Sequence, residues 1–272
     1  MTKILITGAA GTLGRRLSDA FENRGDQVVG IDRPGHGQAG VLEADLSVWS
    51  EGWPEHFTGV DAVVHLAADP SPAATWASLQ HLNMDMVLNV FEAAARASVR
   101  RVIFASSNWV MGGWRTKQGS IRPSDDPFPI NGYGATKLMG ERIGHHFSHA
   151  RGLSVICFRI GMAERAGGTP PSLDSPHGLW GQQMWLSNRD LIQAFAKGID
   201  APDDVRFAVL NLTSANEGSR WDLEPTKQTI GYRPEDGHPT MSNHVFELHE
   251  QTMSTMIRLA EEQLQVVADT GA

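Results

Sequence analysis

Short apolar runs alternate with segments of helical spacing along residues 1–161 of the chain. The apolar runs are rich in Val, Ile and Leu and nearly continuous in hydrophobicity, which is typical of strands covered on both faces. Strands and helices in alternation form right-handed βαβ units and therefore a parallel sheet. We expect a doubly wound α/β fold with strands at residues 3–8, 27–32, 40–46, 61–68, 101–107 and 153–161, and helices at 12–24, 77–98 and 133–150.

The alternation ends near Gly161, and the rest of the chain is less regular. Residues 163–182 are rich in Gly, Pro and Ser and predict a long loop, which in a compact domain is usually functional or mobile. The apolar side chains of residues 243–268 share one helical face, so this tail is expected to dock on its own domain or on a partner subunit. Between these segments the pattern predicts a helix at 188–199, a strand at 206–213 and a turn-rich stretch at 231–239.

The stretch TGAAGTLG at residues 7–14 places three glycines after the first predicted strand and at the start of a helix. Gly8 permits a tight turn, Gly11 lets backbone approach a pyrophosphate, and Gly14 lets helix and strand pack closely. The helix N-terminus then faces the phosphates with its partial positive charge. The spacing is GxxGxxG rather than GxGxxG, which alone is a weak signal, but the flanking strand and helix favour a dinucleotide site. Thr12 and Leu13 lie inside this turn.

Asp32 closes the second predicted strand. A carboxylate there accepts hydrogen bonds from a ribose 2′-hydroxyl and repels a 2′-phosphate, so it favours NAD over NADP. Arg33 could pair with a phosphate. Asp45 is expected either to reach the adenine amino group or to cap the end of the third strand. The remaining candidate cofactor contacts are Leu46, Leu66, Ala67 and Ala68.

One of the two tyrosines of the chain, Tyr133, lies four residues before Lys137 on a predicted helix. The two side chains therefore share a face, and an ammonium group close to a phenol favours the phenolate. A phenol of lowered pKa can act as a general base. Ser107 ends a predicted strand, at the sheet edge where ligands of α/β proteins collect. The alternative is an amphipathic helix with a surface Tyr and Lys, but the glycine turn and Ser107 favour a proton-transfer site.

The motifs TGAAGTLG, Asp32, HLAA, FASSN and YGATK, in this order, resemble the extended short-chain dehydrogenase/reductases, the NAD-dependent epimerase/dehydratase family. The resemblance covers essentially the whole chain. It implies a Rossmann-type sheet and a catalytic set of Ser107, Tyr133 and Lys137, with the lysine also holding the nicotinamide ribose. Asn83 matches the asparagine that anchors the helix beside the cofactor site, and Met86 stands where the family usually has glycine.

The predicted domain organisation follows from the strand pattern and the resemblance together. Residues 1–161 are expected to form the NAD-binding core with the catalytic helix. Residues 162–242 are expected to form a small C-terminal substrate-binding lobe, and residues 243–272 a C-terminal helix. Members of the family often dimerise through the helices that hold residues 77–98 and 133–150 here, so the resemblance also implies a homo-oligomer.

The stretches VIFASSNWVMGG, VICFRIGM, QMWLSNRDLIQAF and GYRPEDG resemble the uronate-dehydrogenase and NAD-dependent aldose-dehydrogenase branch of the family. Enzymes of that branch oxidise the anomeric carbon of a sugar to a lactone. By this resemblance, sugar contacts are expected at Asp69, Asn108, Gly161 and Met162, and the segment with Ser187 and Asp190 is expected to organise the pocket.

Two tryptophans depart from the pattern of that branch. Trp109 replaces the usual histidine, and Trp180 aligns with an arginine that binds a substrate anion. An indole cannot make the bidentate bonds of a guanidinium, so we expect a neutral or differently read sugar, with Trp109, Trp180 and Trp185 as stacking walls. Arg165 and Arg189 could still supply a charge, and the indoles could instead be ordinary packing.

Composition excludes several other classes of function. The net charge of −8 argues against nucleic acid as a main partner, and no apolar run reaches the roughly 18 residues that span a bilayer. The N-terminus enters a strand at once, so we expect no signal peptide. The single cysteine, Cys157, lies in an apolar run, is expected in the core, and fits a reducing cytoplasm.

Three other interpretations remain as alternatives. A sugar-nucleotide epimerase or dehydratase would keep NAD bound and regenerate it. An NAD-sensing protein would bind NAD without turnover that depends on Tyr133, and the segment HGLWGQQMW could bind a partner protein instead of covering a pocket. His145, His146 and His149 follow the catalytic helix, and His145 and His149 could share a metal by their i,i+4 spacing. No nearby Cys or acidic residue completes a set, so we expect no metal.

Overall fold

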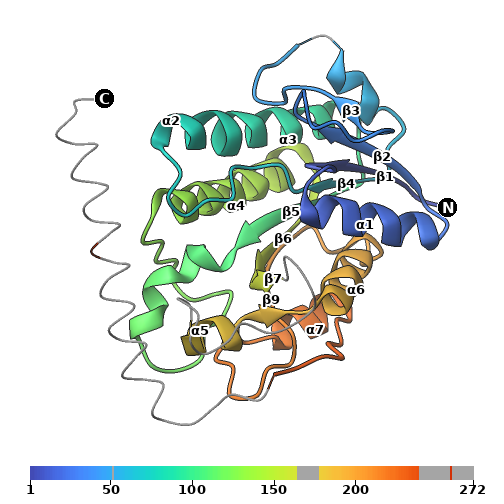
Figure 1. Cartoon of the computed structure of the whole chain (residues 1–272). Helices are drawn as coiled ribbons and strands as arrows, with labels where there is room; N and C mark the ends of the chain where they lie inside the picture. The colour runs from blue at the N-terminus through green and yellow to red at the C-terminus, as the bar shows by residue number, and fades with distance from the viewer. Residues whose placement is uncertain (51, 164–177, 239–257, 259–272) are drawn as a thin grey trace.

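The computed structural model describes residues 1–50, 52–163, 178–238 and 258. Their centre is a sheet in the order β3-β2-β1-β4-β5-β6-β9, in which every neighbouring pair of strands is parallel (Figure 1). This confirms the expected doubly wound α/β class. The strands are β1 (Lys3–Thr7), β2 (Gln27–Asp32), β3 (Leu42–Glu43), β4 (Ala62–His65), β5 (Arg101–Ser107), β6 (Ser154–Ile160) and β9 (Phe207–Leu212).

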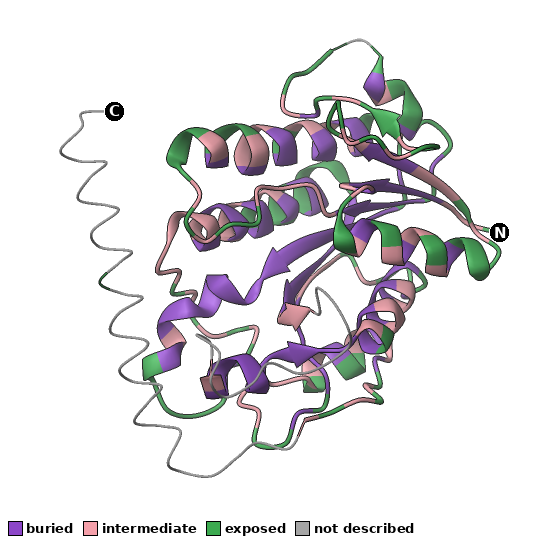
Figure 2. Cartoon of the chain, in the orientation of Figure 1, coloured by how far each residue is buried: buried purple, intermediate pink, exposed green. Residues whose placement is uncertain are grey.

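Helices cover both faces of the sheet (Figure 1). Leu17 and Phe21 of α1 and Phe195 of α6 pack on one face, and Phe91 of α3 and Phe147 of α4 pack on the other. Every residue of β5 and β6 is buried, which explains why their sequences are nearly continuous in hydrophobicity (Figure 2). The helices are α1 (Thr12–Asn23), α2 (Trp76–Leu79), α3 (Met86–Arg96), α4 (Gly132–Arg151), α6 (Asn188–Ile199) and α7 (Glu224–Ile230).

The expected helix at residues 77–98 is interrupted. Between α2 and α3 the chain makes a π-helical segment, η2 (Gln80–Asp85). Such segments are rare and frequently lie at functional sites, because the wider turn re-aims a side chain. Here η2 carries Asn83, which is buried and reaches the loop after β4.

Other elements differ from the expected pattern. The third strand is only two residues long at the edge of the sheet, instead of spanning residues 40–46. The expected loop at residues 163–182 ends in a short helix, α5 (Gly178–Gln183), and residues 164–177 lie outside the described part. The 3₁₀ segments η1 (Trp53–Phe57) and η3 (Asn108–Thr116) and helix α7 were not predicted. The tail at residues 243–268, apart from Arg258, also lies outside the described residues.

The segment expected to form a separate lobe contributes to the main sheet and its core. Strand β9 pairs with β6, and α6 packs in the same cluster as α1. A second, two-stranded parallel ladder joins β7 (Met162–Ala163) to β8 (Trp185–Leu186), directly after the end of β6. None of the helices that the structure describes is both long enough and apolar enough to cross a membrane.

Candidate active site

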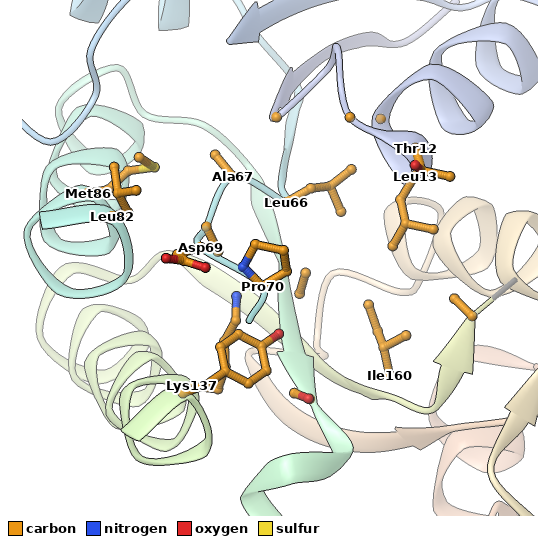
Figure 3. A pocket seen from close by; sticks show the side chains of 18 of the residues that line it. Thr12, Leu13, Leu66, Ala67, Asp69, Pro70, Leu82, Met86, Lys137 and Ile160 are labelled. Atoms are coloured by element: carbon orange, nitrogen blue, oxygen red, sulfur yellow. The ribbon is translucent and has the colours of Figure 1, made fainter. Parts of the chain in front are cut away.

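A cavity of about 1500 Å³ opens along the carboxyl ends of β1, β2, β4, β5 and β6 (Figure 3). The strand order reverses between β1 and β4, and this is the position at which open α/β sheets bind their ligands. Figure 3 shows Thr12 and Leu13 on one side of the cavity and Leu82 and Met86 on another, with Asp69, Pro70 and Lys137 between them. The cavity therefore brings residues from both halves of the sheet together.

The glycine turn permits very close approaches of backbone at the start of α1. Gly8 has a φ of +73°, and a Cβ atom there would lie 2.8 Å from the backbone nitrogen of Ala67. A Cβ atom on Gly14 would lie 2.2 Å from the carbonyl oxygen of Gly8. Gly11 is the N-cap residue of α1 and supplies no side-chain cap, so the first N–H groups of the helix are available to an anion.

The carboxylate of Asp32 lies beside this turn. It accepts hydrogen bonds from the backbone N–H groups of Ala10 and Arg33, each at 2.8 Å. The side chain of Asp45 caps the end of the β3 segment by accepting bonds from the N–H and Oγ of Ser47. Asp32, Arg33 and Asp45 all line the cavity, so the capping role of Asp45 does not remove it from the site.

A buried hydrogen bond holds β4 against the glycine turn. The Oγ1 atom of Thr7 lies 2.7 Å from Nδ1 of His65 and accepts a bond from the N–H of Ala67. Burial, with a smaller contribution from the charge of Lys137, lowers the pKa of His65 to about 3, so this imidazole is neutral at ordinary pH. The strand end with Leu66, Ala67 and Ala68, all of which line the cavity, is thereby fixed close to Gly8.

Asn83 anchors the loop after β4 instead of lining the cavity. Its Oδ1 accepts the N–H of Asp69 at 2.8 Å, and its Nδ2 donates to the carbonyl of Asp69 and to Oγ1 of Thr136 on α4. These bonds hold the loop after β4 against α4 from behind the cavity wall, whereas Asp69 itself lines the cavity.

Ser107, Tyr133 and Lys137 all line the cavity. Ser107 ends β5, and its Oγ accepts the N–H of Trp109 at 3.2 Å. Tyr133 lies in the first turn of α4, which Asn131 caps by accepting the N–H of Gly134 at 2.7 Å. The backbone of α4 packs so closely on η3 that a Cβ atom on Gly134 would lie 2.5 Å from the carbonyl oxygen of Trp109.

Lys137 is buried between two aromatic rings. Its Nζ lies 5.7 Å from the centroid of the Tyr133 ring and 5.1 Å from that of Phe104. Only 3% of the residue is exposed, and this burial lowers the pKa of Lys137 to about 7. Burial therefore disfavours the charged form of Lys137 in the protein without ligands. An anion that forms next to the ammonium group would stabilise this charged form.

The three tryptophans that were expected to form stacking walls have different positions. Trp109 and Trp185 line the cavity, together with Asn108, Gly161 and Met162. Trp180 does not line it among the described residues. Instead Trp180 is buried in a separate apolar cluster, with its ring centroid 5.4 Å from that of Trp221.

The buried guanidinium of Arg115 stacks between two of these indoles. Its Cζ lies 4.3 Å from the ring centroid of Trp109 and 5.2 Å from that of Trp180. Arg115 itself does not line the cavity as far as the structure describes it, so its contact with Trp109 supports the cavity wall from behind.

Ser187 also lies away from the cavity lining. It is the N-cap residue of α6, accepts the N–H of Asp190 and donates to the carboxylate of Asp236. The fully buried Asp190 accepts bonds from Oγ of Ser214 and from the N–H of Glu235. These bonds fasten the turn-rich stretch to α6. Arg189 of α6 adds to them by pairing with Asp236 and Glu235.

Sequence reasoning missed a group of cavity residues that carry no chemical motif. Their side chains are mostly apolar or small, and only the folded chain shows which of them face the cavity. They include Ala10, Gly35, His36, Ala44, Pro70, Pro72, Ser78, Leu82, Met86, Ala105, Ser106, Ile160, Ala163 and Met184. Leu82 and Met86 lie four residues apart, one before and one after Asn83, and this helical spacing is the one signal that could have placed them.

The three histidines after the catalytic helix show packing contacts. The rings of His145 and His149 stack with centroids 6.4 Å apart, and His145 meets the edge of Phe207. Among the described residues, no three His, Cys, Asp or Glu side chains lie together as a set that could hold a metal ion.

Comparisons with known proteins agree with this arrangement. The sequence model described as the NAD dependent epimerase/dehydratase family matches residues 4–172. An L-arabinose 1-dehydrogenase (NAD(P)(+)) of Haloferax volcanii is 34% identical over 255 residues, which cover 89% of this chain and 99% of that protein. A uronate dehydrogenase of Pseudomonas putida is 29% identical over 245 residues, covering 88% of this chain and 85% of that protein.

A solved structure is similar over most of the chain. The crystal structure of uronate dehydrogenase from Agrobacterium tumefaciens superposes with a TM-score of 0.75 at 25% identity, covering 92% of this chain and 88% of that one. The likeness therefore includes the segment after Gly161 as well as the first six strands.

Proposed function

The chain belongs to the NAD-dependent epimerase/dehydratase family, and from this premise we propose that it oxidises a sugar hydroxyl with NAD as the electron acceptor. The reaction that we propose is oxidation at C1 of an aldose- or uronate-type sugar, which gives a lactone. The observation that carries the proposal is the placement of Ser107, Tyr133 and Lys137 in one cavity with the glycine turn and Asp32. The relatives named as arabinose and uronate dehydrogenases support the choice of a sugar.

The residues at the nucleotide end of the cavity fit NAD. A Cβ atom at Gly8 or Gly14 would collide with neighbouring backbone, so only glycine fits at these two positions. The N-terminus of α1 points its free N–H groups into the same space. Asp32 would hold the adenosine ribose, with Arg33 and Asp45 beside it, and its carboxylate favours NAD over NADP. NAD, when bound, supplies the acceptor for the hydride of the sugar carbon.

Tyr133 would take the proton from the substrate hydroxyl. Lys137 would favour its phenolate, and the phenolate in turn would stabilise the buried ammonium group. Ser107 would hold the reacting oxygen beside the phenol through its Oγ. Lys137 would also hold the nicotinamide ribose.

The sugar end of the cavity supports a neutral substrate. Its described lining is apolar or uncharged around Trp109, Trp185 and Met162. Oδ1 of Asn108 and Nε1 of Trp185 are buried, and neither has a hydrogen-bond partner among the residues that the structure describes. A sugar hydroxyl could donate to the first and accept from the second, which would satisfy both groups.

An NADH-absorbance screen over neutral aldoses, sugar acids and sugar phosphates tests the function. We expect net NADH formation with a free neutral sugar and a turnover lowered by roughly 10²-fold or more in Tyr133→Phe, with NAD binding retained. Near-wild-type turnover of Tyr133→Phe would refute the role of the tyrosine, and robust turnover of glucuronate or galacturonate would refute the neutral substrate. An epimerase or dehydratase would convert a sugar nucleotide without net NADH.

Assembly and location remain proposals. The exposed side chains of Trp76 on α2 and Leu88 on α3 support a homo-oligomer formed through the helices at residues 77–98 and 133–150. Sedimentation of the full chain at two concentrations would show a monomer if this proposal is wrong.

A cytoplasmic location is likewise proposed and is consistent with a buried, unpaired Cys157.

A further inference from the structure

A buried ion pair lies directly behind the proposed catalytic set. Nε and Nη2 of Arg159 on β6 donate to the two carboxylate oxygens of Glu141 on α4, at 2.9 Å and 2.8 Å. Both side chains are only 3% exposed. Oγ of Ser106, the penultimate residue of β5, donates to the same carboxylate at 2.6 Å. The third nitrogen of Arg159, Nη1, donates to the carbonyl of Pro123 at 3.3 Å.

The position of this network matters because Glu141 and Ser106 each adjoin a proposed catalytic residue, and Arg159 lies opposite Ser106 on the neighbouring strand. Tyr133, Lys137 and Glu141 follow one another at intervals of four on α4, so they lie along one side of the helix. Ser106 lines the cavity immediately before Ser107. The network therefore joins the helix of the proposed base to the strand end of the proposed hydroxyl donor.

Helix α4 lies very close to the sheet. It approaches the strands through glycines: a Cβ atom on Gly140 would lie 2.3 Å from the ring of Phe104, and one on Gly144 would lie 2.9 Å from Val155. At this distance a polar network can join the helix directly to the strands. A buried ion pair usually adds little stability over apolar packing of the same volume, but it fixes direction and distance.

We propose that Ser106, Glu141 and Arg159 form a positioning network that sets Tyr133 and Lys137 in register with Ser107 and keeps the charge beneath them balanced. Its catalytic consequence rests on the proposed function. The three residues touch neither sugar nor nicotinamide in this role; they act through the elements that carry the reacting groups.

The balance of charge gives the proposal a signature that simple destabilisation lacks. Removing Arg159 leaves a buried carboxylate one helical turn from Lys137, which opposes the phenolate of Tyr133. Removing the charge of Glu141 leaves a buried guanidinium, which favours that phenolate. The other titratable or charged groups near these side chains, from each packed element, are His65 on β4, Asp69 in the loop after β4, Cys157 on β6, Arg142 on α4, and Asp125 and Asp126 in the loop before α4.

The chain contains a matched control at the opposite end of the same two strands. Nε of Arg101, the first residue of β5, donates to Oγ of Ser154, the first residue of β6, at 2.9 Å, and both residues are buried. Ser154→Ala and Ser106→Ala therefore remove equivalent hydroxyl groups, one far from the cavity and one beside it. Both changes keep the fold, because neither leaves a buried charge without its main partners.

Tyr133 can be titrated by its phenolate absorbance without any substrate. The chain has two tyrosines, and burial raises the pKa of Tyr232, whose hydroxyl donates to the carbonyl of Thr213. A Tyr133→Phe blank identifies the signal. In Glu141→Gln we expect the Tyr133 transition to move to lower pH by roughly one unit, and in Arg159→Met to higher pH by a similar amount.

Turnover gives the second measurement. We expect Ser106→Ala to lower kcat by about 10-fold, with the KM for NAD unchanged, and Ser154→Ala to lower the melting temperature similarly with kcat unchanged. Equal loss of kcat in both serine variants, or phenolate transitions that move in the same direction or not at all, would overturn the proposal. A wild-type protein that oxidises no sugar would refute the proposed function, whereas the phenolate titration would still decide the network.

Discussion

Nζ of Lys137 lies 5.7 Å from the centroid of the Tyr133 ring, and both residues line the same cavity. The lysine is buried, and burial lowers its pKa to about 7 because the charged form loses its hydration. This relationship couples the proposed chemistry to the stability of the fold.

We expect the cofactor-free protein to gain stability as the pH rises from about 7 to about 10. Over this range the unfolded chain keeps Lys137 protonated while the folded chain releases the proton, so unfolding binds a proton. The contribution approaches about 1.4 kcal/mol per pH unit. Urea unfolding of wild type and Lys137→Met at several pH values measures it, and a difference between the two proteins that is constant with pH would contradict it.

Gly14→Ala should disrupt the nucleotide end of the cavity. The added Cβ atom would lie 2.2 Å from the carbonyl oxygen of Gly8, so α1 must move away from β1. We expect a loss of about 1–3 kcal/mol in the free energy of unfolding and at least a roughly 10-fold weaker NADH binding by fluorescence. Gly52→Ala is the control, because a Cβ atom at Gly52 meets no atom within 4 Å. Unchanged NADH affinity in Gly14→Ala would contradict the site.

Asp32→Ala should raise the KM for NAD by roughly 10- to 100-fold and change the KM for NADP much less. The variant loses the predicted bond to the ribose hydroxyl and leaves the N–H groups of Ala10 and Arg33 without their carboxylate partner. Asp61→Ala provides the control, because Asp61 accepts the N–H of Lys3 at the other end of the sheet. A wild-type protein that binds NADP more tightly than NAD would show that Asp32 does not set the preference.

Trp185→Phe and Trp180→Phe should affect different quantities, the first substrate binding and the second stability. Trp185 lines the cavity, so its replacement should raise the KM for the sugar several-fold, because the indole N–H and part of the wall are lost. Trp180 packs against Trp221 in a buried cluster, so its replacement should lower the melting temperature and leave the KM unchanged. Steady-state kinetics with thermal melts separates the two; an effect of Trp180→Phe on KM alone would restore it as a substrate wall.

The sequence predicted the parallel α/β core because the strands are covered on both faces and their apolar runs are nearly uninterrupted. Strands β1, β2, β4, β5, β6 and β9 and helices α1, α4 and α6 lie where periodicity placed them. The π-helical turn at Asn83 was missed because helical spacing continues through it. The third strand was predicted too long, at residues 40–46 instead of Leu42–Glu43.

The candidate site was predictable where a residue type has one role at a given place, as for Gly8, Asp32, Tyr133 and Lys137. Their chemical roles stay predictions. The tryptophans could not be assigned in the same way, because an indole in a cavity wall and an indole in a core look alike in sequence. Trp180 and Trp185 are five residues apart, and only the turn from α5 into β8 separates their surroundings.

The β7–β8 ladder has a consequence for how such a protein can diversify. It follows β6 directly as a separate two-stranded ladder, so the wall beside Trp185 is built apart from the glycine turn, while the proposed nucleotide contacts come largely from residues before β5. Substitutions at residues 160–163 and 184–185 can therefore alter the accepted sugar without disturbing the glycine turn.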